Sequence, residues 1–144
     1  MRFEGRRRAQ LLDRCWSIYL WLTHDFPLPE HFHVEFPAAA ESTLVAETLH
    51  LTVPISETLT LSLREEYKFE RQVLEVSRYS YNVLDHQGSN LLRADNLPYH
   101  RTDYRGRVLT HPPHHLHDEQ GRVRSFTGQV QDFITAAKNF LPSA

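Results

Sequence analysis

The chain has 144 residues, of which 40% are hydrophobic and 24% charged, and its formal net charge at pH 7 is −2. This length suits a single domain over residues 1–144. No apolar run approaches the roughly 20 residues of a transmembrane helix, and the charge excludes a globally basic nucleic-acid-binding protein. The arginine-rich start is followed by Asp13 and Arg14 without a small-residue cleavage site. We therefore expect a soluble, cytoplasmic protein without membrane association.

Residues 6–24 predict a helix, because apolar side chains recur there at steps of three and four residues. Pro27 and Pro29 end it, since proline lacks the amide that a further turn requires. The single Cys15 falls within the apolar stripe, so we expect a buried thiol. The stripe comprises Leu11, Leu12, Cys15, Trp16, Tyr19, Leu20 and Trp21 or Leu22.

Several segments alternate between apolar and polar residues with a period of two, which is typical of strands with one buried face. Their short connections predict an antiparallel meander. Glu65 and Glu66 are interpreted as part of a solvated strand end. The long segment 72–84 changes its register midway, which predicts either a bulge or a strand covered on both sides. The expected strands are residues 31–36, 45–53, 59–67, 72–84 and 90–94.

Residues 85–88 predict the hairpin loop before the last of these strands, with Gly88 available for a positive φ. A helical apolar stripe returns over residues 126–141, and Ser125 or Thr127 is its candidate N-cap. The expected fold class is α+β: a curved antiparallel β-sheet of about five strands, packed by an N-terminal and a C-terminal helix.

The segment between Asp85 and Asp118 holds six of the ten histidines, and regular periodicity is lost after Asn96. Imidazoles titrate near neutrality and pack poorly, so their clustering is the main functional clue. Six arginines around the loop predict a local basic patch. They are Arg93, Arg101, Arg105, Arg107, Arg122 and Arg124.

Motifs within residues 78–117 carry a resemblance. The series R-Y-S-Y at 78–81, D-x-x-G at 85–88, L-L-R-A-D-N at 91–96, P-Y-H at 98–100 and P-H-H-L-H at 113–117 resembles the TumE-like family, small proteins described as toxins of toxin–antitoxin pairs. The chain departs from the family pattern at Ala94, Tyr99 and Leu116, the last of which replaces the usual lysine. The resemblance implies a compact α+β fold, action on RNA or another nucleotide, and an antitoxin protein as a partner.

RNA can be cleaved without a metal ion if one group removes the 2′-OH proton, another protonates the leaving oxygen and cations stabilise the phosphorane. In an extended P-H-H-L-H segment, His115 and His117 point to one side and His114 to the other. His115 and His117 are therefore the leading acid–base candidates, supported by His100, Arg93 and Asp95. Asp95 either orients a histidine or caps the Asp-Asn turn.

Other side chains of the loop are candidates for substrate binding, either by stacking on bases or by holding phosphates. They are Tyr99, Tyr104, Arg101, Arg105 and His114. Tyr79 and Tyr81 are interpreted first as core or interface residues.

Alternatives to metal-free RNA cleavage stay open. A zinc or nickel site could form from His111, His114, His115 and His117, although their spacing matches no established motif and no cofactor is expected first. The substrate could be a small cyclic oligonucleotide, as for a CRISPR-associated ring nuclease, and a homodimer would suit such a symmetric ligand. A noncatalytic module that binds a nucleotide or a partner belongs to a third class.

Overall fold

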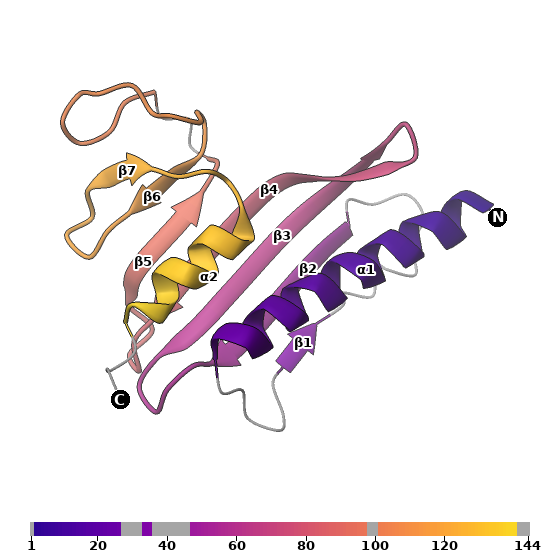
Figure 1. Cartoon of the computed structure of the whole chain (residues 1–144), viewed down its shortest axis with the longest axis horizontal. Helices are drawn as coiled ribbons and strands as arrows, with labels where there is room; N and C mark the ends of the chain where they lie inside the picture. The colour runs from indigo at the N-terminus through magenta and orange to yellow at the C-terminus, as the bar shows by residue number, and fades with distance from the viewer. Residues whose placement is uncertain (1, 27–32, 36–46, 98–100, 141–144) are drawn as a thin grey trace.

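The computed structural model describes residues 2–26, 33–35, 47–97 and 101–140, which form two helices and one sheet of seven strands (Figure 1). The expected α+β fold with an N-terminal and a C-terminal helix is confirmed, and the sheet has two strands more than expected. In chain order the elements are α1 (Arg2–Asp25), β1 (His33–Glu35), β2 (Glu47–Pro54), β3 (Thr60–Glu70), β4 (Val73–Leu84), β5 (Asn90–Asp95), β6 (His115–His117), β7 (Val123–Ser125) and α2 (Val130–Lys138).

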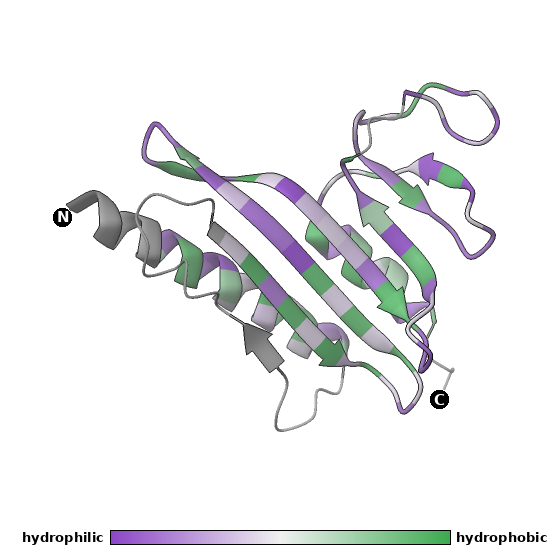
Figure 2. Cartoon of the chain, turned by 180° about the vertical axis from the view of Figure 1, so that it is seen from behind, coloured by the Kyte–Doolittle hydropathy of each residue, from purple (hydrophilic) through white to green (hydrophobic). Residues whose placement is uncertain are grey.

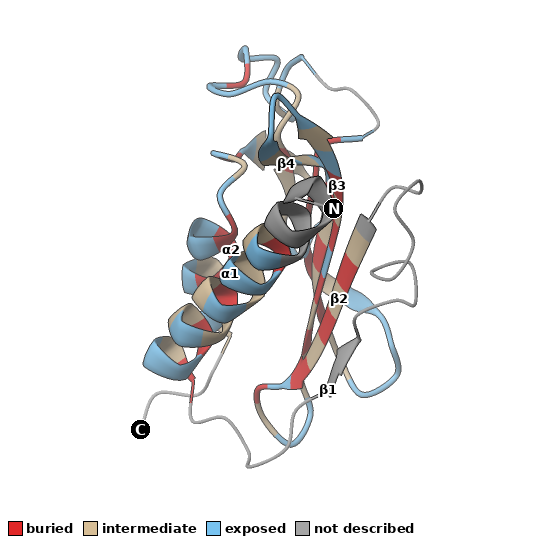
Figure 3. Cartoon of the chain, turned by 90° about the vertical axis from the view of Figure 1, so that its right-hand side faces the viewer, coloured by how far each residue is buried: buried red, intermediate tan, exposed pale blue. Residues whose placement is uncertain are grey.

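The strands follow one another through the sheet in chain order, and each pairs antiparallel with the next. This is the predicted meander. Both helices lie on the same side of the sheet (Figure 3). The opposite face is left open by the described residues and is turned toward the viewer in Figure 2. Neither helix is both long and apolar enough to span a membrane.

The hydrophobic core lies between the sheet and the two helices. Leu51, Leu63 and Tyr81 are opposite one another on β2, β3 and β4, and all three are buried. α1 covers them with Ile18 and Leu22, and α2 adds Phe133 and Ile134. Burying each aliphatic side chain of this kind stabilises the fold by roughly 1.5–3 kcal/mol.

The buried stripe of α1 is narrower than the sequence suggested. Leu11, Ile18 and Leu22 face the core, but Trp16 is 61% exposed and the adjacent Leu12 and Leu20 are also exposed. The prediction that Leu12, Trp16 and Leu20 face the core is therefore wrong. The helix presents one side to the sheet, so apolar residues on its other side remain in solvent. Cys15 lies at the margin and is only partly buried, and burial raises the pKa of its thiol.

The register change that the sequence predicted in residues 72–84 is a β-bulge. Glu66 is opposite Arg78, but the next residue, Tyr67, is opposite Val76, so Ser77 is the extra residue of β4. The side-chain amide of Asn96 stabilises the bulge by donating to the Ser77 carbonyl (3.0 Å) and accepting from the Tyr79 amide (3.2 Å). Because of the bulge, apolar residues on both sides of Ser77 lie on the helix-covered face.

Glu65 is not part of a solvated strand end, and that interpretation is wrong. Its carboxylate is fully buried on the helix-covered face. Arg14 of α1 donates two hydrogen bonds to it, at 2.9 and 2.7 Å, and the hydroxyls of Tyr67 and Tyr81 donate to it as well. A buried charge is tolerated when it is paired and hydrogen-bonded in this way. Tyr81 and the neighbouring Tyr79 are core residues, as predicted.

Two features of the C-terminal part differ from the sequence-based expectations. β6 and β7 lie in a region without periodicity, because strands of three residues are too short to show an alternation. α2 is shorter than the predicted helix and has Gln129 at its N-cap. Ser125 belongs to β7, and the hydroxyl of Thr127 accepts from the Gln129 amide and donates to Asp132. Neither of the two candidate residues is therefore the N-cap.

Candidate functional site

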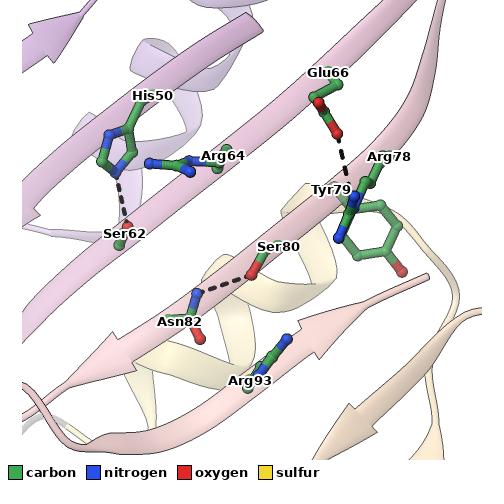
Figure 4. A pocket seen from close by; sticks show the side chains of 9 residues that line it. All are labelled: His50, Ser62, Arg64, Glu66, Arg78, Tyr79, Ser80, Asn82 and Arg93. Carbon is green, nitrogen blue, oxygen red and sulfur yellow. Dashed lines mark hydrogen bonds and ion pairs between the residues drawn. The ribbon is translucent and has the colours of Figure 1, made fainter. Parts of the chain in front are cut away.

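The open face of the sheet is polar because the residues between the core positions of each strand point to it. On β3, Ser62, Arg64 and Glu66 alternate with buried Leu61, Leu63 and Glu65. Polar residues of β2, β4 and β5 stand next to them across the strands, and together they line an open cavity of about 480 Å³ (Figure 4). Its lining residues are His50, Ser62, Arg64, Glu66, Arg78, Tyr79, Ser80, Asn82 and Arg93.

Positive charge predominates in this cavity. Arg64, Arg78 and Arg93 line it together with one carboxylate, that of Glu66, which lies 3.7 Å from the Arg78 guanidinium. His50 adds an imidazole whose Nε2 is 3.1 Å from the Ser62 hydroxyl (Figure 4). Three guanidiniums on one concave surface suit an anionic ligand such as a phosphate ester.

Sequence reasoning identified Arg93 but missed the other cavity residues. Their signal is the polar half of each strand's alternation, in which Arg64 and Arg78 recur at outward positions. That signal can be interpreted only when the pairing of the neighbouring strands is known, because the pairing shows which polar residues lie side by side. A solvated sheet face and a binding face have the same period, so alternation alone does not distinguish them.

At one end of the cavity, β5 and β6 bring together three of the predicted catalytic residues. Asp95 and His115 are opposite one another in the register, and His115 Nε2 lies 2.6 Å from Asp95 Oδ1. Arg93 Nε donates to the other carboxylate oxygen at 2.7 Å. Of the two contacts considered for Asp95, the structure shows the one with a histidine. The adjacent Asn96 stabilises the bulge instead of a local turn.

The surroundings of His115 favour its charged form. The ring is completely buried, its Nδ1 is 2.9 Å from the Pro113 carbonyl oxygen, and its Nε2 faces Asp95. Burial opposes the imidazolium, but the contacts with Asp95 and Pro113 outweigh it, so the pKa of His115 is raised. Burial likewise disfavours the Asp95 carboxylate, but His115 and Arg93 more than compensate and lower the pKa of Asp95. With Arg93, the trio carries a net positive charge when His115 is protonated.

His117 is the more accessible of the two leading candidates. It is opposite Arg93 in the register, and its partly exposed ring meets that of His115 edge-on, with centroids 4.9 Å apart. The prediction that His115 and His117 point to one side is therefore confirmed. His114 points to the other side, where its Nδ1 lies 2.9 Å from the Tyr79 hydroxyl and its ring stacks on Tyr79.

The remaining predicted site residues do not join this group. Arg101 is exposed on the loop between β5 and β6, and Tyr104 and Arg105 belong to a separate cluster beside β7. His111 is exposed, with its Nδ1 2.9 Å from the Thr110 hydroxyl. His100 and Tyr99 lie outside the described residues.

Within the described ranges, the residues that could share one metal ion are Asp95, His115 and His117, whose ligand atoms lie within 4.8 Å of one another. One carboxylate and two imidazoles are donors that Zn²⁺ and similar ions accept. His115 Nδ1 is already engaged by a backbone carbonyl, which is the usual second contact of a metal-bound histidine. The set considered from sequence differs, since His111 and His114 have other neighbours and Asp95 takes their place.

The arrangement can bind an anion and move a proton beside it. The cavity supplies guanidiniums, the trio of Arg93, Asp95 and His115 supplies a net positive charge when His115 is protonated, and His117 supplies an imidazole at the edge of both. These are the functions that phosphodiester cleavage requires of a protein. No family model matches the chain, and no curated protein or solved structure is significantly similar to it.

Proposed function

We propose that this chain is a TumE-like phosphodiesterase that binds RNA or a small oligonucleotide on the open face of the sheet and cleaves it by histidine chemistry. One observation carries the proposal: the arginine-lined cavity borders on the Asp95–His115–His117 group. Arg93 belongs to both, since it lines the cavity and donates to Asp95. A phosphate in the cavity would thus lie next to a group that can exchange a proton.

In this proposal His117 accepts the proton of the attacking 2′-OH and returns it to the 5′ oxygen as the bond between that oxygen and phosphorus breaks. His115 is buried and its pKa is raised by Asp95 and the Pro113 carbonyl, so it acts by orienting the ring of His117 and, when protonated, by adding positive charge. Arg93 is 44% exposed and uses its Nε for Asp95, and its guanidinium carries further donors for the phosphorane oxygens. Electrostatic stabilisation of this kind is usually the largest contribution to catalysis.

The test is cleavage of labelled single-stranded RNA and of cyclic oligoadenylate, each with and without EDTA. The His117→Ala variant should lose about 100-fold or more in kcat, which is the typical contribution of general acid–base catalysis. The matched control is His86→Ala, because His86 is exposed in the hairpin between β4 and β5. Equal cleavage by the wild type and His117→Ala would refute the proposed role of His117, and loss of cleavage in EDTA would assign the site to a metal ion.

A noncatalytic binding module is the second candidate, and the burial of His115 favours it. A histidine whose two ring nitrogens both face oxygen atoms inside the protein can serve to hold β5 and β6 together. Such a module would bind the same oligonucleotides, would leave them intact and would bind them equally well after His117→Ala. An antitoxin protein or a second copy of the chain belongs to the same class of partners.

A further inference from the structure

A second group of cations surrounds Tyr104, away from the open face. Three guanidiniums lie close to its ring centroid: those of Arg122 at 4.9 Å, Arg124 at 5.0 Å and Arg105 at 5.2 Å. They come from a loop and from the region of β7. We call these four residues the Tyr104 cluster.

The main chain and two carboxylates hold the cluster in place. The Tyr104 amide donates to the Val123 carbonyl at 2.8 Å, which attaches the loop to β7. The Asp103 carboxylate accepts from the amide of Arg105 at 2.8 Å and so shapes the turn. In the turn after β6, the Asp118 carboxylate accepts from the amide of Arg122 at 2.9 Å. It also pairs with the side chains of Arg122 (3.0 Å) and Arg124 (2.6 Å). The positions of the four side chains are therefore fixed by the loop and by the hairpin between β6 and β7.

The charge of this region is opposite to that of the whole chain. Residues 101–124 contain five arginines against three carboxylates, whereas the complete sequence has a net charge of −2. A surface cation–π contact is weak and the cations repel one another, so the Tyr104 ring by itself does not account for three guanidiniums around it. Tyr104 remains 37% exposed, so the ring is accessible to a ligand.

The cluster and the candidate site lie on opposite sides of the same sheet edge. Arg124 is opposite Leu116, which packs against the core. The preceding residue, Val123, is opposite His117 and lies on the open side. β7 is the last strand of the sheet, and neighbouring strands are about 4.8 Å apart. The loop that carries Tyr104 is bonded to this edge of β7, so an extended polyanion that leaves the open face here passes over that loop to reach the cluster.

We propose that the Tyr104 cluster is a second binding site for single-stranded RNA, in which a base stacks on Tyr104 or on a guanidinium and the flanking phosphates bind the arginines. The inference rests on the proposed function in taking an oligonucleotide as the ligand. It adds that the substrate is a linear strand, because a compact cyclic oligonucleotide would not reach both sides of the edge. Aromatic stacking beside cations suits single strands of any sequence.

The experiment measures the affinity of labelled oligouridylate and of a uridine dinucleotide by fluorescence anisotropy. Tyr104→Leu should weaken binding of the long strand by about tenfold, since stacking contributes about 1–3 kcal/mol per base. Arg105→Gln should weaken it less and should reduce the salt dependence by about one phosphate contact. Binding of the dinucleotide to the open face should stay unchanged in both variants. Lys68→Gln, a change at another exposed cation, is the control.

Unchanged affinity of both variants for the long strand would overturn the inference, as would a wild-type protein that does not bind the strand. If these variants instead lose binding to polyglutamate and keep binding to RNA, the cluster recognises an acidic protein and the inference is wrong. Thermal melting shows whether Tyr104→Leu folds, and Arg105→Gln decides the matter if it does not. Cleavage is measured separately, so binding without cleavage would refute the proposed enzyme and leave the second site intact.

Discussion

Each face of the sheet has a buried carboxylate bound by an arginine, and the two differ in their third partner. On the covered face, Glu65 accepts from Arg14 and from two tyrosine hydroxyls. On the open face, Asp95 accepts from Arg93 and faces the imidazole of His115. Burial first, and then the charge of Glu65, raise the pKa values of both tyrosines, so those hydroxyls keep their protons near neutral pH.

The two groups differ in their access to solvent and to the cavity. The Glu65 group is closed within the core between α1 and the sheet. The Asp95 group is next to a partly exposed histidine and an arginine-lined cavity, and its third partner is an imidazole instead of a pair of tyrosine hydroxyls. Changes at Glu65 should therefore affect stability alone, and changes at Asp95 should affect both stability and activity.

The largest effect on stability is expected for Glu65→Gln. The substitution leaves the guanidinium of Arg14, whose side chain is 24% exposed, without its carboxylate, and breaking such a pair costs about 3 kcal/mol. Urea denaturation should show this loss in the free energy of unfolding, whereas cleavage per folded molecule should stay at the wild-type rate. Glu75→Gln, at an exposed position of β4, should change neither quantity. A folded Glu65→Gln variant with impaired cleavage would contradict the assigned structural role.

Asp95→Asn should have a smaller effect on stability and a large effect on activity. The amide removes the charge that favours the His115 imidazolium, so we expect a loss of about 2 kcal/mol and a fall in kcat of at least about tenfold. Circular dichroism during urea unfolding and the RNA cleavage assay measure the two effects. Asp13→Asn on the exposed side of α1 is the control. Full activity in Asp95→Asn would show that the Asp95–His115 pair is purely structural.

The contribution of the Asp95–His115 pair to stability should depend on pH in both directions. The raised pKa of His115 stabilises the fold fully below the unfolded value of about 6.5, and this contribution is lost as the pH rises through the folded pKa. The lowered pKa of Asp95 stabilises the fold above about 3.9, and this contribution is lost as the pH falls through the folded value.

The stability difference between the wild type and Asp95→Asn should therefore be largest between about pH 4 and 6.5. Thermal melting of both proteins from well below this range to well above it measures the difference. A difference that does not vary with pH would show that neither group changes its pKa on folding.

The smallest expected effect lies at the hairpin between β3 and β4. Arg71 and Gln72 both have a positive φ, of 51° and 65°, which asparagine and glycine adopt more readily. Gln10 of α1 stabilises this turn through the Gln72 carbonyl (2.9 Å) and the Leu74 amide (2.8 Å). Arg71→Asn should raise the free energy of unfolding by about 0.5 kcal/mol and leave RNA affinity unchanged. Weaker RNA binding by this variant would show that the hairpin contacts RNA, which would contradict the proposed binding surface.

The sequence predicted elements whose signals are local. The alternation of β2 to β5 and the hairpin ending in Gly88 were predicted, and Gly88 has the expected positive φ of 83°. A bulge within residues 72–84 was one of two predicted alternatives, because the apolar residues change from even to odd positions there, and the structure places the bulge at Ser77. The turn at Arg71 and Gln72 gave no such signal, since neither residue is typical of a two-residue hairpin.

What the sequence did not predict depends on contacts between distant segments. Glu65 lies on the same face of its strand as Leu61 and Leu63, and Arg14 interrupts the apolar stripe of α1. Only the packing of α1 on the sheet shows that these two charges are in contact. The same holds for the cavity, which joins residues of four strands. The pairing of Asp95 with His115 was among the alternatives, because both residues belong to the motifs, but the burial of His115 was not expected.

The most direct test of the account is a map of the backbone amide shifts that a uridine dinucleotide causes in the NMR spectrum of the protein. The proposed binding face predicts that the shifts concentrate on β3 to β6, near Arg64, Arg93 and His117, and leave α1 and α2 unchanged. Shifts confined to the helix-covered side, or no shifts at saturating dinucleotide, would contradict the claim that the open face is the binding site.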